Sequence, residues 1–452
     1  MGDPRDVFKA YDIRGTVPDQ LDPDLCRAIG AAFVTVTAAS RVLVVRDMRP
    51  SGVELAGAFT DGVRSQGAAV TDLGMASTDF LYFAAGRLNS PGAMFTASHN
   101  PAAYNGIKLC LAGAAPVGQD TGLREIEALA VAYLADPPTP LARGPLDHQD
   151  LLAEYVAHVH SFIDRGSLRA LTVVADTANG MGGLIVPLVF AGLPFEVEIL
   201  YPELDGTFPN HPADPIQPEN LEDLKAAVLA RGADIGLAFD GDADRVFLVD
   251  ERAAPVSGSL TTALVAATLL DKHPGSTVLY NLICSHVVPE VIEEHGGIAV
   301  RTRVGHSFMK ATMAETGAVF GGEHSGHYYF RDNYRADSGI IAALVVLELL
   351  SRADRPLSEL LSPFRRYANS GEINTVVTDP QAAVDAVAKR VDGEATSIDH
   401  LDGLTADFGE WWFNLRPSNT EPLLRLNVEA RTEDACGRHV REVLDLVAEC
   451  AP

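Results

Sequence analysis

Three aspartates stand at alternate positions directly after an apolar run, and they offer the clearest chemistry in the sequence. The run is Ile235 to Phe239, and the carboxylates are Asp240, Asp242 and Asp244. Alternate carboxylates on such a turn can face one point, and three anions together require a hard cation. Open α/β sheets bind ligands at the carboxyl ends of strands, which favours a metal site over a solvated acidic turn. An EF-hand calcium loop is excluded, because Arg245 stands where that loop needs glycine.

A serine loop in the first third of the chain offers a site for covalent chemistry. Ser98 and His99 follow the short apolar stretch Ala93 to Phe95, and Lys108 lies in the next apolar segment. A serine in a tight loop after a strand can carry a phosphoryl group, although the segment lacks the GxSxG pattern of hydrolases. The alternative is an ordinary turn or capping serine, with a loop histidine and a surface lysine beside it. If Lys108 lies near Ser98, it can transfer protons.

A third set of side chains, near the end of the chain, suits a phosphate group. Arg416, Ser418, Asn419 and Thr420 supply a planar guanidinium, two hydroxyls and an amide in one short segment. These donors, together with neighbouring backbone N–H groups, match the oxygens of a phosphate. The alternative is a proline-containing β-turn with ordinary capping residues.

Charge and composition narrow the class of protein. The 452 residues carry a net charge of −26 and are 47% hydrophobic, which is typical of a globular chain with several domains. The negative charge excludes nucleic acid as a partner, because a phosphate backbone would be repelled. An anionic substrate therefore needs cations that are concentrated inside the motifs.

Cysteine usage and hydropathy predict a cytoplasmic protein. The five cysteines are scattered without CxxC spacing, which favours a reducing compartment over a disulfide framework or zinc site. No apolar run follows the N-terminus, as a signal peptide would require. The longest apolar stretch, Gly339 to Leu350, is too short to span a bilayer, so we expect a buried helix and no membrane partner.

A strand–helix alternation that recurs three times must position these side chains. Buried parallel strands are predicted at 41–45, 171–175 and 276–280, each before a helical pattern. Further along each unit, a short strand ends in a polar loop, which holds Ser98, Asp240 or Glu323. Such strand ends are where α/β sheets place their ligands.

The chain is predicted to divide into four domains, at 1–148, 149–250, 251–366 and 367–452. Proline-rich residues at 136–140 close the first domain. Beyond residue 367 the pattern changes to that of an α+β unit with antiparallel strands, and Arg416 lies between two of these strands.

In their order along the chain, these motifs resemble those of the α-D-phosphohexomutase family, of the phosphomannomutase/phosphoglucomutase type. The resemblance covers the whole chain and is carried by 8–15, the Ser98 loop with Lys108, and the loops of Asp240, Glu323 and Arg416. It implies three related mixed-sheet α/β domains plus a smaller C-terminal α+β domain around a central cleft. It also implies a reversible transfer of phosphoryl groups between the 1- and 6-hydroxyls of hexose phosphates.

The resemblance also implies a role for each motif. Ser98 would be phosphorylated in the resting enzyme, and its phosphate would bind Mg²⁺ together with Asp240, Asp242 and Asp244. Transfer to a hexose monophosphate would give a hexose 1,6-bisphosphate, which turns over and returns its other phosphate to Ser98. The catalytic residues implied are Ser98, His99, Lys108, Arg14, Arg245 and His306. The substrate-binding residues implied are Tyr11, Glu323, Ser325, His327, Arg416, Ser418, Asn419 and Thr420.

The sugar preference is predicted to depend on the loop of Glu323. A carboxylate there can accept hydrogen bonds from the 3- and 4-hydroxyls, which glucose and mannose share, so we expect both hexose phosphates as substrates. Phosphoglucosamine mutases usually carry glycine where this chain has Asn419, which leaves that branch as an alternative beside a Mg²⁺-dependent sugar phosphatase. One departure is Ile283, where relatives often have lysine. We expect a monomer or dimer.

Overall fold

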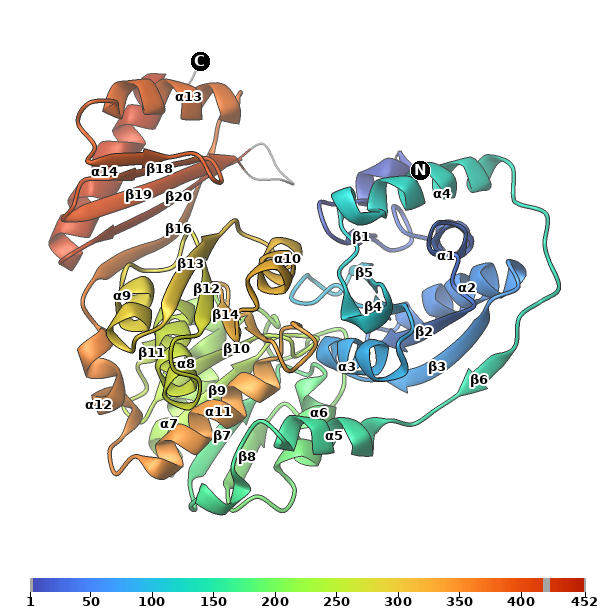
Figure 1. The fold of residues 1–452 in the computed structure, drawn as a ribbon, viewed down its shortest axis with the longest axis horizontal. Helices are drawn as coiled ribbons and strands as arrows, with labels where there is room; N and C mark the ends of the chain where they lie inside the picture. The colour runs from blue at the N-terminus through green and yellow to red at the C-terminus, as the bar shows by residue number, and fades with distance from the viewer. Residues whose placement is uncertain (1–2, 418–422, 451–452) are drawn as a thin grey trace.

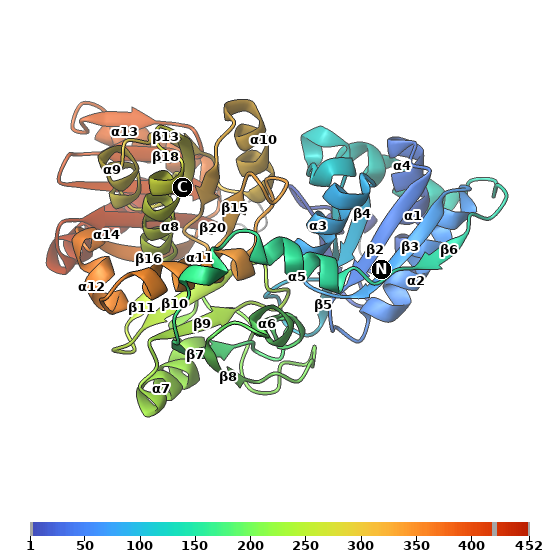
Figure 2. The ribbon, with the colours of Figure 1, turned by 60° about the horizontal axis from the view of Figure 1, so that its bottom comes forward.

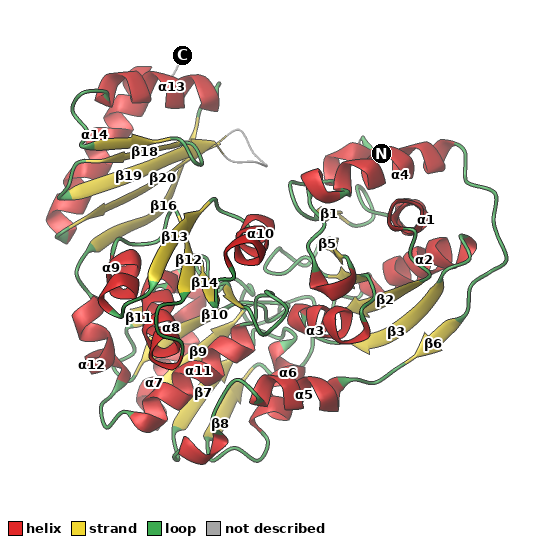
Figure 3. Cartoon of the chain, in the orientation of Figure 1, coloured by secondary structure: helices red, strands yellow, loops and turns green. Residues whose placement is uncertain are grey.

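The computed structural model describes residues 3–417 and 423–450, and four β-sheets follow one another along the chain. The four units lie along an arc, with the N-terminal unit at one end and the C-terminal unit at the other (Figure 1). Helices pack against every sheet (Figure 3). Among the described residues, no helix is both long and apolar enough to cross a membrane.

The first unit has a six-stranded sheet in the order β1-β5-β4-β2-β3-β6. Its strands are β1 (Ile13–Thr16), β2 (Arg41–Arg46), β3 (Ala69–Met75), β4 (Gly92–Phe95), β5 (Tyr104–Cys110) and β6 (Leu146–His148). Its helices are α1 (Pro23–Thr37), α2 (Gly52–Ser65), α3 (Thr78–Leu88) and α4 (Leu123–Ala135).

The second unit has a five-stranded sheet in the order β11-β10-β9-β7-β8. Its strands are β7 (Thr172–Asp176), β8 (Glu196–Leu200), β9 (Ile235–Phe239), β10 (Val246–Asp250) and β11 (Pro255–Val256). Its helices are α5 (Leu152–His160), α6 (Gly182–Phe190) and α7 (Glu222–Arg231). Helix α5 lies beside the first unit and leads into the second (Figure 2).

The third unit has a four-stranded sheet in the order β13-β12-β14-β15. Its strands are β12 (Thr277–Asn281), β13 (Ile298–Thr302), β14 (Phe320–Gly322) and β15 (Tyr328–Phe330). Its helices are α8 (Gly258–Lys272), α9 (Val287–Glu294), α10 (His306–Thr316), α11 (Gly339–Arg352) and α12 (Leu357–Leu361).

The first three units share one topology. In each unit, a central strand (β2, β7 or β12) is flanked by two parallel strands. One of the flanking strands (β4, β9 or β14) pairs on its other side with an antiparallel strand. The repeat predicted from the strand–helix pattern is thus present in the strand order itself. The central strands are almost wholly buried, which is why they read as continuous apolar runs.

The fourth unit is entirely antiparallel, in the order β16-β20-β19-β18-β17. Its elements are β16 (Ala368–Val376), α13 (Pro380–Val391), β17 (Ser397–Asp399), β18 (Leu404–Asp407), β19 (Trp411–Pro417), β20 (Leu423–Ala430) and α14 (Glu433–Cys450). Its apolar core is separate, whereas one large core joins residues of the first, second and third units. The predicted fold class, three related α/β domains plus a smaller α+β domain, is confirmed.

Local sequence explains most element limits. Asp22 and Asp379 each accept a hydrogen bond from a backbone N–H of the first helical turn, and a proline follows each of them. Aspartate at the N-cap with proline next is a strong helix start.

The second sheet runs past residue 250, because β11 pairs with β10. The predicted domain limits stay predictions.

Four of the five cysteines have described side chains, and none of them forms a disulfide. Cys26, Cys110, Cys284 and Cys436 are all buried thiols. Burial raises the pKa of the Cys110 thiol and that of Cys284 to about 12, which keeps them protonated and unreactive. A structural disulfide framework therefore plays no part in the described fold.

Candidate active site

The three predicted loops occupy equivalent places in the three related units. Each connects a parallel strand to its antiparallel neighbour: the Ser98 loop joins β4 to β5, the Asp240 loop joins β9 to β10, and the Glu323 loop joins β14 to β15. Because the topology repeats, the three loops leave corresponding edges of their sheets. They meet at the centre of the arc.

Direct contacts join these loops. A Cβ on Gly241 would overlap the carbonyl oxygen of Ser98, so only glycine permits this approach between the Ser98 loop and the Asp240 loop. On the other side, Arg245 of the Asp240 loop forms a backbone bridge with His327 of the Glu323 loop. Segments that are far apart in the sequence therefore form one site.

Ser98 lies at the centre of the site and is 4% exposed. Its φ of +50° is a left-handed conformation, which is uncommon for serine and typical of strained functional positions. Its Oγ donates to Asp240 Oδ2 at 2.6 Å, and Arg245 Nη2 donates to the same Oγ at 2.9 Å. The hydroxyl is thus held between a carboxylate and a guanidinium.

The three aspartates form a buried group whose oxygens lie close enough to ligate one metal ion. One oxygen from each of Asp240, Asp242 and Asp244 lies within 4.8 Å of the others. Among the described residues, Oδ1 of Asp242 and Oδ1 of Asp244 have no hydrogen-bond partner. Unpaired, fully buried carboxylate oxygens are costly unless a cation binds them, so the residues present fit a hard divalent metal.

Lys108 is buried against the aspartates and is not a surface lysine. Its ammonium donates to Asp242 Oδ2 at 2.9 Å and to Asp244 Oδ2 at 2.5 Å. Burial by itself lowers the pKa of Lys108, but Asp242 and Asp244 outweigh it and raise that pKa well above the usual value. The ammonium of Lys108 is therefore held in its charged form between two carboxylates, and its role in proton transfer stays a prediction.

Burial and the neighbouring charges together shift the pKa values of the aspartates. Burial raises the pKa of Asp240 well above its usual value, against the lowering effect of Arg245. Burial also acts on Asp242, but Lys108 and the hydroxyl of Thr78, which donates at 2.6 Å, hold the pKa of Asp242 below its usual range. Such opposed shifts in one group of carboxylates are typical of functional sites.

His99 and Arg14 lie at the edge of the serine loop. His99 Nδ1 is 3.3 Å from Ser98 Oγ, and it also contacts Arg245. Burial, followed by the charges of Arg245 and Arg14, lowers the pKa of His99 well below its usual value, so the ring is neutral. Arg14 donates at 2.5 Å to Asn100 Oδ1, in the loop of Ser98.

Glu323 is 2% exposed and is held by the third unit. Its Oε1 accepts from the backbone N–H of Gly305 at 3.1 Å and from Asn281 at 3.2 Å, and its Oε2 accepts from the Tyr329 hydroxyl at 2.7 Å. These donors orient the carboxylate and leave further lone pairs for a ligand.

Ser325 and His327 connect the Glu323 loop to the Asp240 loop. Ser325 Oγ lies 3.0 Å from His327 Nδ1. His327 Nε2 lies 3.7 Å from Asp244 Oδ1 and 3.9 Å from Asp337 Oδ2. A second group with the geometry of metal ligands consists of Asp244, His327 and Asp337. Lys310 lies 3.1 Å from Asp337 and already supplies a positive charge to this group.

Tyr11 and His306 bring the first and third units together. Their rings meet edge to face, with centroids 5.0 Å apart. Both ring nitrogens of His306 are buried without a partner among the described residues, and burial lowers its pKa well below the usual value. Burial, followed by Asp12 and Glu323, raises the pKa of Tyr11, while Arg416 and Arg14 lower it.

The fourth unit contributes Arg416, which is 5% exposed at the end of β19. Its Nη2 donates to Glu372 Oε2 at 2.7 Å. Its charge acts to lower the pKa of Tyr11 in the first unit, against the larger raising effect of burial. The predicted phosphate ligands Ser418, Asn419 and Thr420 lie outside the described residues.

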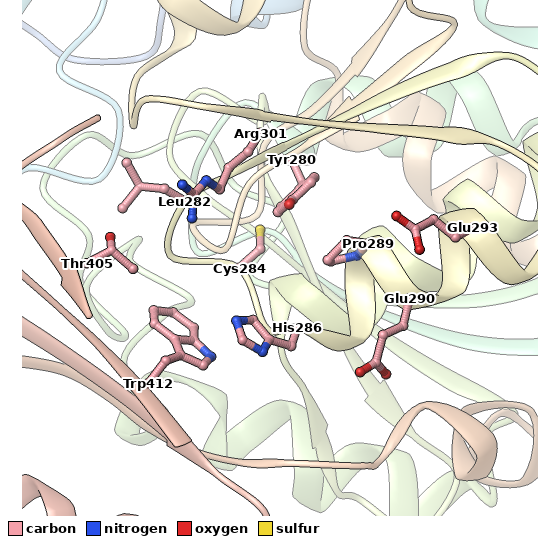
Figure 4. A pocket seen from close by; sticks show the side chains of 10 residues that line it. All are labelled: Tyr280, Leu282, Cys284, His286, Pro289, Glu290, Glu293, Arg301, Thr405 and Trp412. Carbon is pink, nitrogen blue, oxygen red and sulfur yellow. The ribbon is translucent and has the colours of Figure 1, made fainter. Parts of the chain in front are cut away.

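The departure at Ile283 leaves an apolar, 5% exposed side chain in the loop after β12. Its neighbours Leu282 and Cys284 line a cavity of about 260 Å³ between the third and fourth units, closed on one side by Trp412 and His286 (Figure 4). The indole and imidazole rings are stacked with centroids 5.2 Å apart. None of the predicted site residues that the structure describes lines this cavity.

Sequence reasoning missed Arg49, which holds the serine loop in place. Its fully buried guanidinium donates to four backbone carbonyl oxygens, those of Ser98, Asn100, Pro101 and Tyr104, at 2.6 to 2.9 Å. Such a fork of donors stabilises the strained turn around Ser98. The only signal in the sequence was an arginine in a polar segment directly after a buried strand.

A buried serine, three clustered aspartates and an arginine on the same hydroxyl define the fold and site as those of a metal-dependent phosphoryl-transfer enzyme. Comparison with known families agrees. The phosphoglucomutase/phosphomannomutase alpha/beta/alpha domains I, II and III match residues 5–134, 153–254 and 257–367, and the C-terminal domain matches 372–446. The chain belongs to the phosphoglucomutase/phosphomannomutase family of α-D-phosphohexomutases.

Relatives are similar over nearly their full length. A protein named phosphohexose mutases from Xanthomonas campestris is 42% identical over 95% of this chain and 96% of its own. A phosphomannomutase from Escherichia coli is 38% identical over 94% of each chain, and a phosphoglucomutase from Neisseria meningitidis is 37% identical over 96% and 95%. The crystal structure of a family protein from Burkholderia thailandensis superposes with a TM-score of 0.89 at 33% identity, covering 99% of both chains.

Proposed function

We propose that this protein moves a phosphoryl group between the 1- and 6-hydroxyls of hexose phosphates, with Ser98 as the carrier. The observation that carries the proposal is the position of Ser98 Oγ, within hydrogen-bonding distance of both Asp240 and Arg245 and beside the aspartate group. Relatives named phosphomannomutase and phosphoglucomutase support mannose and glucose phosphates as the substrates.

The metal proposed for this site is Mg²⁺. Asp240, Asp242 and Asp244 would hold it, together with an oxygen of phosphorylated Ser98. When bound, the ion supplies charge neutralisation for the transferring phosphoryl group. The hard carboxylate oxygens of this site are the ligands that Mg²⁺ prefers.

The chain's own residues would handle charge and protons around the carrier. Arg245 offsets negative charge on the transferring group, as phosphoryl transfer demands. Lys108, with Arg14 and His99 nearby, would manage the proton of the attacking or leaving sugar hydroxyl. His306 would do the same work when the hexose 1,6-bisphosphate lies in its alternate orientation.

Binding of the sugar would be divided between two units. Glu323, with Ser325, His327 and Tyr11, would bind the sugar hydroxyls. Arg416, with Ser418, Asn419 and Thr420, would bind the phosphate that does not react. This division allows either end of the bisphosphate to face Ser98.

The experiment that tests the proposal follows turnover and the carrier together. A coupled assay with glucose 1-phosphate and mannose 1-phosphate, activated by glucose 1,6-bisphosphate, should show conversion to the 6-phosphates. Intact mass should show a fraction heavier by one phosphate, which Ser98→Ala removes along with most turnover. Ser40→Ala, at an exposed serine in the same unit, is the matched control and should keep both the phosphorylated fraction and the turnover.

Three outcomes would contradict the proposal. Release of inorganic phosphate without isomerised product would point to a phosphatase. Faster turnover of glucosamine 1-phosphate than of either hexose phosphate would point to a phosphoglucosamine mutase. Full activity of Ser98→Ala would exclude Ser98 as the carrier.

A further inference from the structure

A buried lysine lies one helical turn after His306 on α10. Lys310 is 2% exposed, and residues four apart on a helix are neighbours on the same face. Its ammonium lies 3.1 Å from Asp337 Oδ1 and 3.5 Å from the centre of the Tyr82 ring. Because Tyr82 belongs to α3, Lys310 joins the third unit to the first at the centre of the arc (Figure 1).

Asp337 connects this lysine to a second histidine of the site. Its carboxylate is buried, with Oδ1 facing Lys310 and Oδ2 3.9 Å from His327 Nε2. Its backbone forms a bridge with Tyr329, whose hydroxyl donates to Glu323. Asp337 is therefore fixed beside the Glu323 loop, with Lys310 on one side and His327 on the other.

Folding alone does not explain a charged pair at this place. The attraction within a buried ion pair often fails to offset the loss of hydration, and apolar side chains of similar volume are often as stable. Within the described part of the chain, neither Lys310 Nζ nor Asp337 Oδ1 makes a hydrogen bond. Only their mutual attraction and the Tyr82 ring compensate the ammonium for lost water. A pair that adds so little stability points to a role in the site.

The pair also acts on the charge of His306. Both ring nitrogens of His306 are buried and have no partner among the residues that the structure describes. Burial, followed by the charge of Lys310, lowers the pKa of His306, and Asp337 acts in the opposite direction. Lys108 and His327 lower that pKa further. The ring is therefore neutral, which is the form that can accept a proton from a sugar hydroxyl.

We propose that Lys310 and Asp337 are positioning residues for the two histidines of the site. Lys310 sets the place of His306 relative to the first unit, and Asp337 sets the place of His327. The inference rests on the proposed function, in which both histidines act on the hexose. Groups that act on a substrate must be held within about 0.5 Å of the productive geometry, so a pair that joins two units at the site controls the rate.

The first test removes the charge of Lys310. Lys310→Met keeps an unbranched side chain, but a thioether does not attract Asp337 as an ammonium does. A shift of about 1 Å in the site can cost about a hundredfold in rate, so kcat for glucose 1-phosphate should fall about tenfold or more. KM should stay within about threefold, because the proposed role involves no contact with the sugar.

A matched control exists on the fourth unit. Lys389→Met, at an exposed lysine of α13, should change neither kcat nor KM. An unchanged kcat for Lys310→Met would overturn the proposal. A raised KM at an unchanged kcat would also overturn it, because that result would mean that Lys310 only binds substrate.

A double variant separates positioning from stability. Lys310→Met by itself leaves Asp337 as an unpaired buried charge, which destabilises the fold. Adding Asp337→Asn removes that charge, so the melting temperature should return toward that of the wild type. A positioning role predicts that kcat of the double variant stays about tenfold or more below the wild type. Recovery of kcat together with the melting temperature would show that the pair only stabilises the fold.

A spectroscopic measurement separates this inference from the proposed function. Nuclear magnetic resonance of the histidine ring nitrogens needs no turnover, and His306→Asn and His327→Asn assign the two rings. Lys310→Met should broaden or split both signals, because the rings are no longer held in one position. Lys310→Arg, which keeps the charge beside Asp337, should leave each ring with one sharp signal.

The outcomes of this measurement are distinct from those of the assay. If the wild-type protein gives sharp ring signals but does not isomerise hexose phosphates, the proposed function fails while the spectra still decide the role of Lys310. Loss of a nearby charge without loss of position would shift a signal and keep it sharp. A single sharp signal for each ring in Lys310→Met would therefore overturn the proposal.

Discussion

At the scale of single residues, the site around Ser98 is a balance of buried charges. Three carboxylates face Lys108 and Arg245, and Ser98 Oγ lies between opposite charges. A substitution that removes one of these charges should therefore shift the pKa values of the remaining groups.

Removing one carboxylate charge should weaken metal binding. Asp242→Asn keeps the acceptor for Thr78 but loses the charge that Lys108 and a cation require. We expect the Mg²⁺ concentration for half-maximal activity to rise and turnover to fall by about two orders of magnitude or more. A magnesium titration of activity measures both effects. Asp354→Asn, at an exposed aspartate, should change nothing; an unchanged Mg²⁺ requirement for Asp242→Asn would place the metal elsewhere.

Neutralising Glu323 should impair both sugars together. Glu323→Gln keeps the volume of the side chain among Gly305, Asn281 and Tyr329 but removes its charge. A hydrogen bond to a charged group contributes about 1.5–3 kcal/mol, so kcat/KM should fall about tenfold or more for glucose 1-phosphate and for mannose 1-phosphate. Parallel assays on the two sugars decide this. A loss with one sugar alone would show that Glu323 reads C2, and not the shared hydroxyls.

At the scale of elements, helices α1 and α2 approach closely because each carries a glycine at the contact. A Cβ on Gly62 would overlap the carbonyl oxygen of Arg27, and a Cβ on Gly30 would overlap that of Phe59. The backbones can only meet where side chains are absent. This packing supports β2 and therefore the start of the segment that carries Arg49.

Two alanine substitutions on helix α2 should change the stability of the protein in opposite directions. Gly62→Ala should destabilise the protein by about 1–3 kcal/mol, because its methyl group forces the helices apart. Gly57→Ala meets no atom within 4 Å and should stabilise it by up to about 1 kcal/mol, through helix propensity. Thermal or urea unfolding measures both. Equal effects of the two changes would show that the close approach does not matter for stability.

At the scale of the whole molecule, one buried carboxylate joins three units. Asp79 at the start of α3 accepts from the hydroxyl of Tyr155 in α5 at 2.7 Å and from that of Ser338, which caps α11, at 2.5 Å. The neighbouring Thr78 donates to Asp242 in the Asp240 loop. This junction holds the first unit against the other two, and so fixes the distance between the Ser98 loop and the Asp240 loop.

Loss of one donor at this junction should loosen it. Tyr155→Phe removes a hydrogen bond to a buried carboxylate, which typically costs about 1.5–3 kcal/mol of unfolding free energy. Because the junction also positions Thr78, we expect a measurable fall in kcat as well. Tyr133→Phe, whose hydroxyl lies 3.3 Å from Oγ1 of the exposed Thr35, is the control and should change neither stability nor kcat. Stability equal to that of the wild type would contradict the role of the junction.

Local sequence was sufficient to predict the elements and the loops that carry chemistry. Strand β9 begins and ends with the apolar run Ile235 to Phe239, because apolar patterning acts over a few residues. The Asp240, Asp242 and Asp244 group was predictable for the same reason: its members are neighbours in sequence.

The relations between the loops depended on packing between distant segments. Lys108 reads as a surface lysine by itself, and it becomes a buried partner of Asp242 only because β5 and β9–β10 lie against each other. Arg49 and Glu372 belong to no motif, and their roles come from carbonyl oxygens and guanidinium groups that other strands bring to them. Hydrogen bonds and ion pairs across such separations form only when the sheets have docked, so no local pattern encodes them.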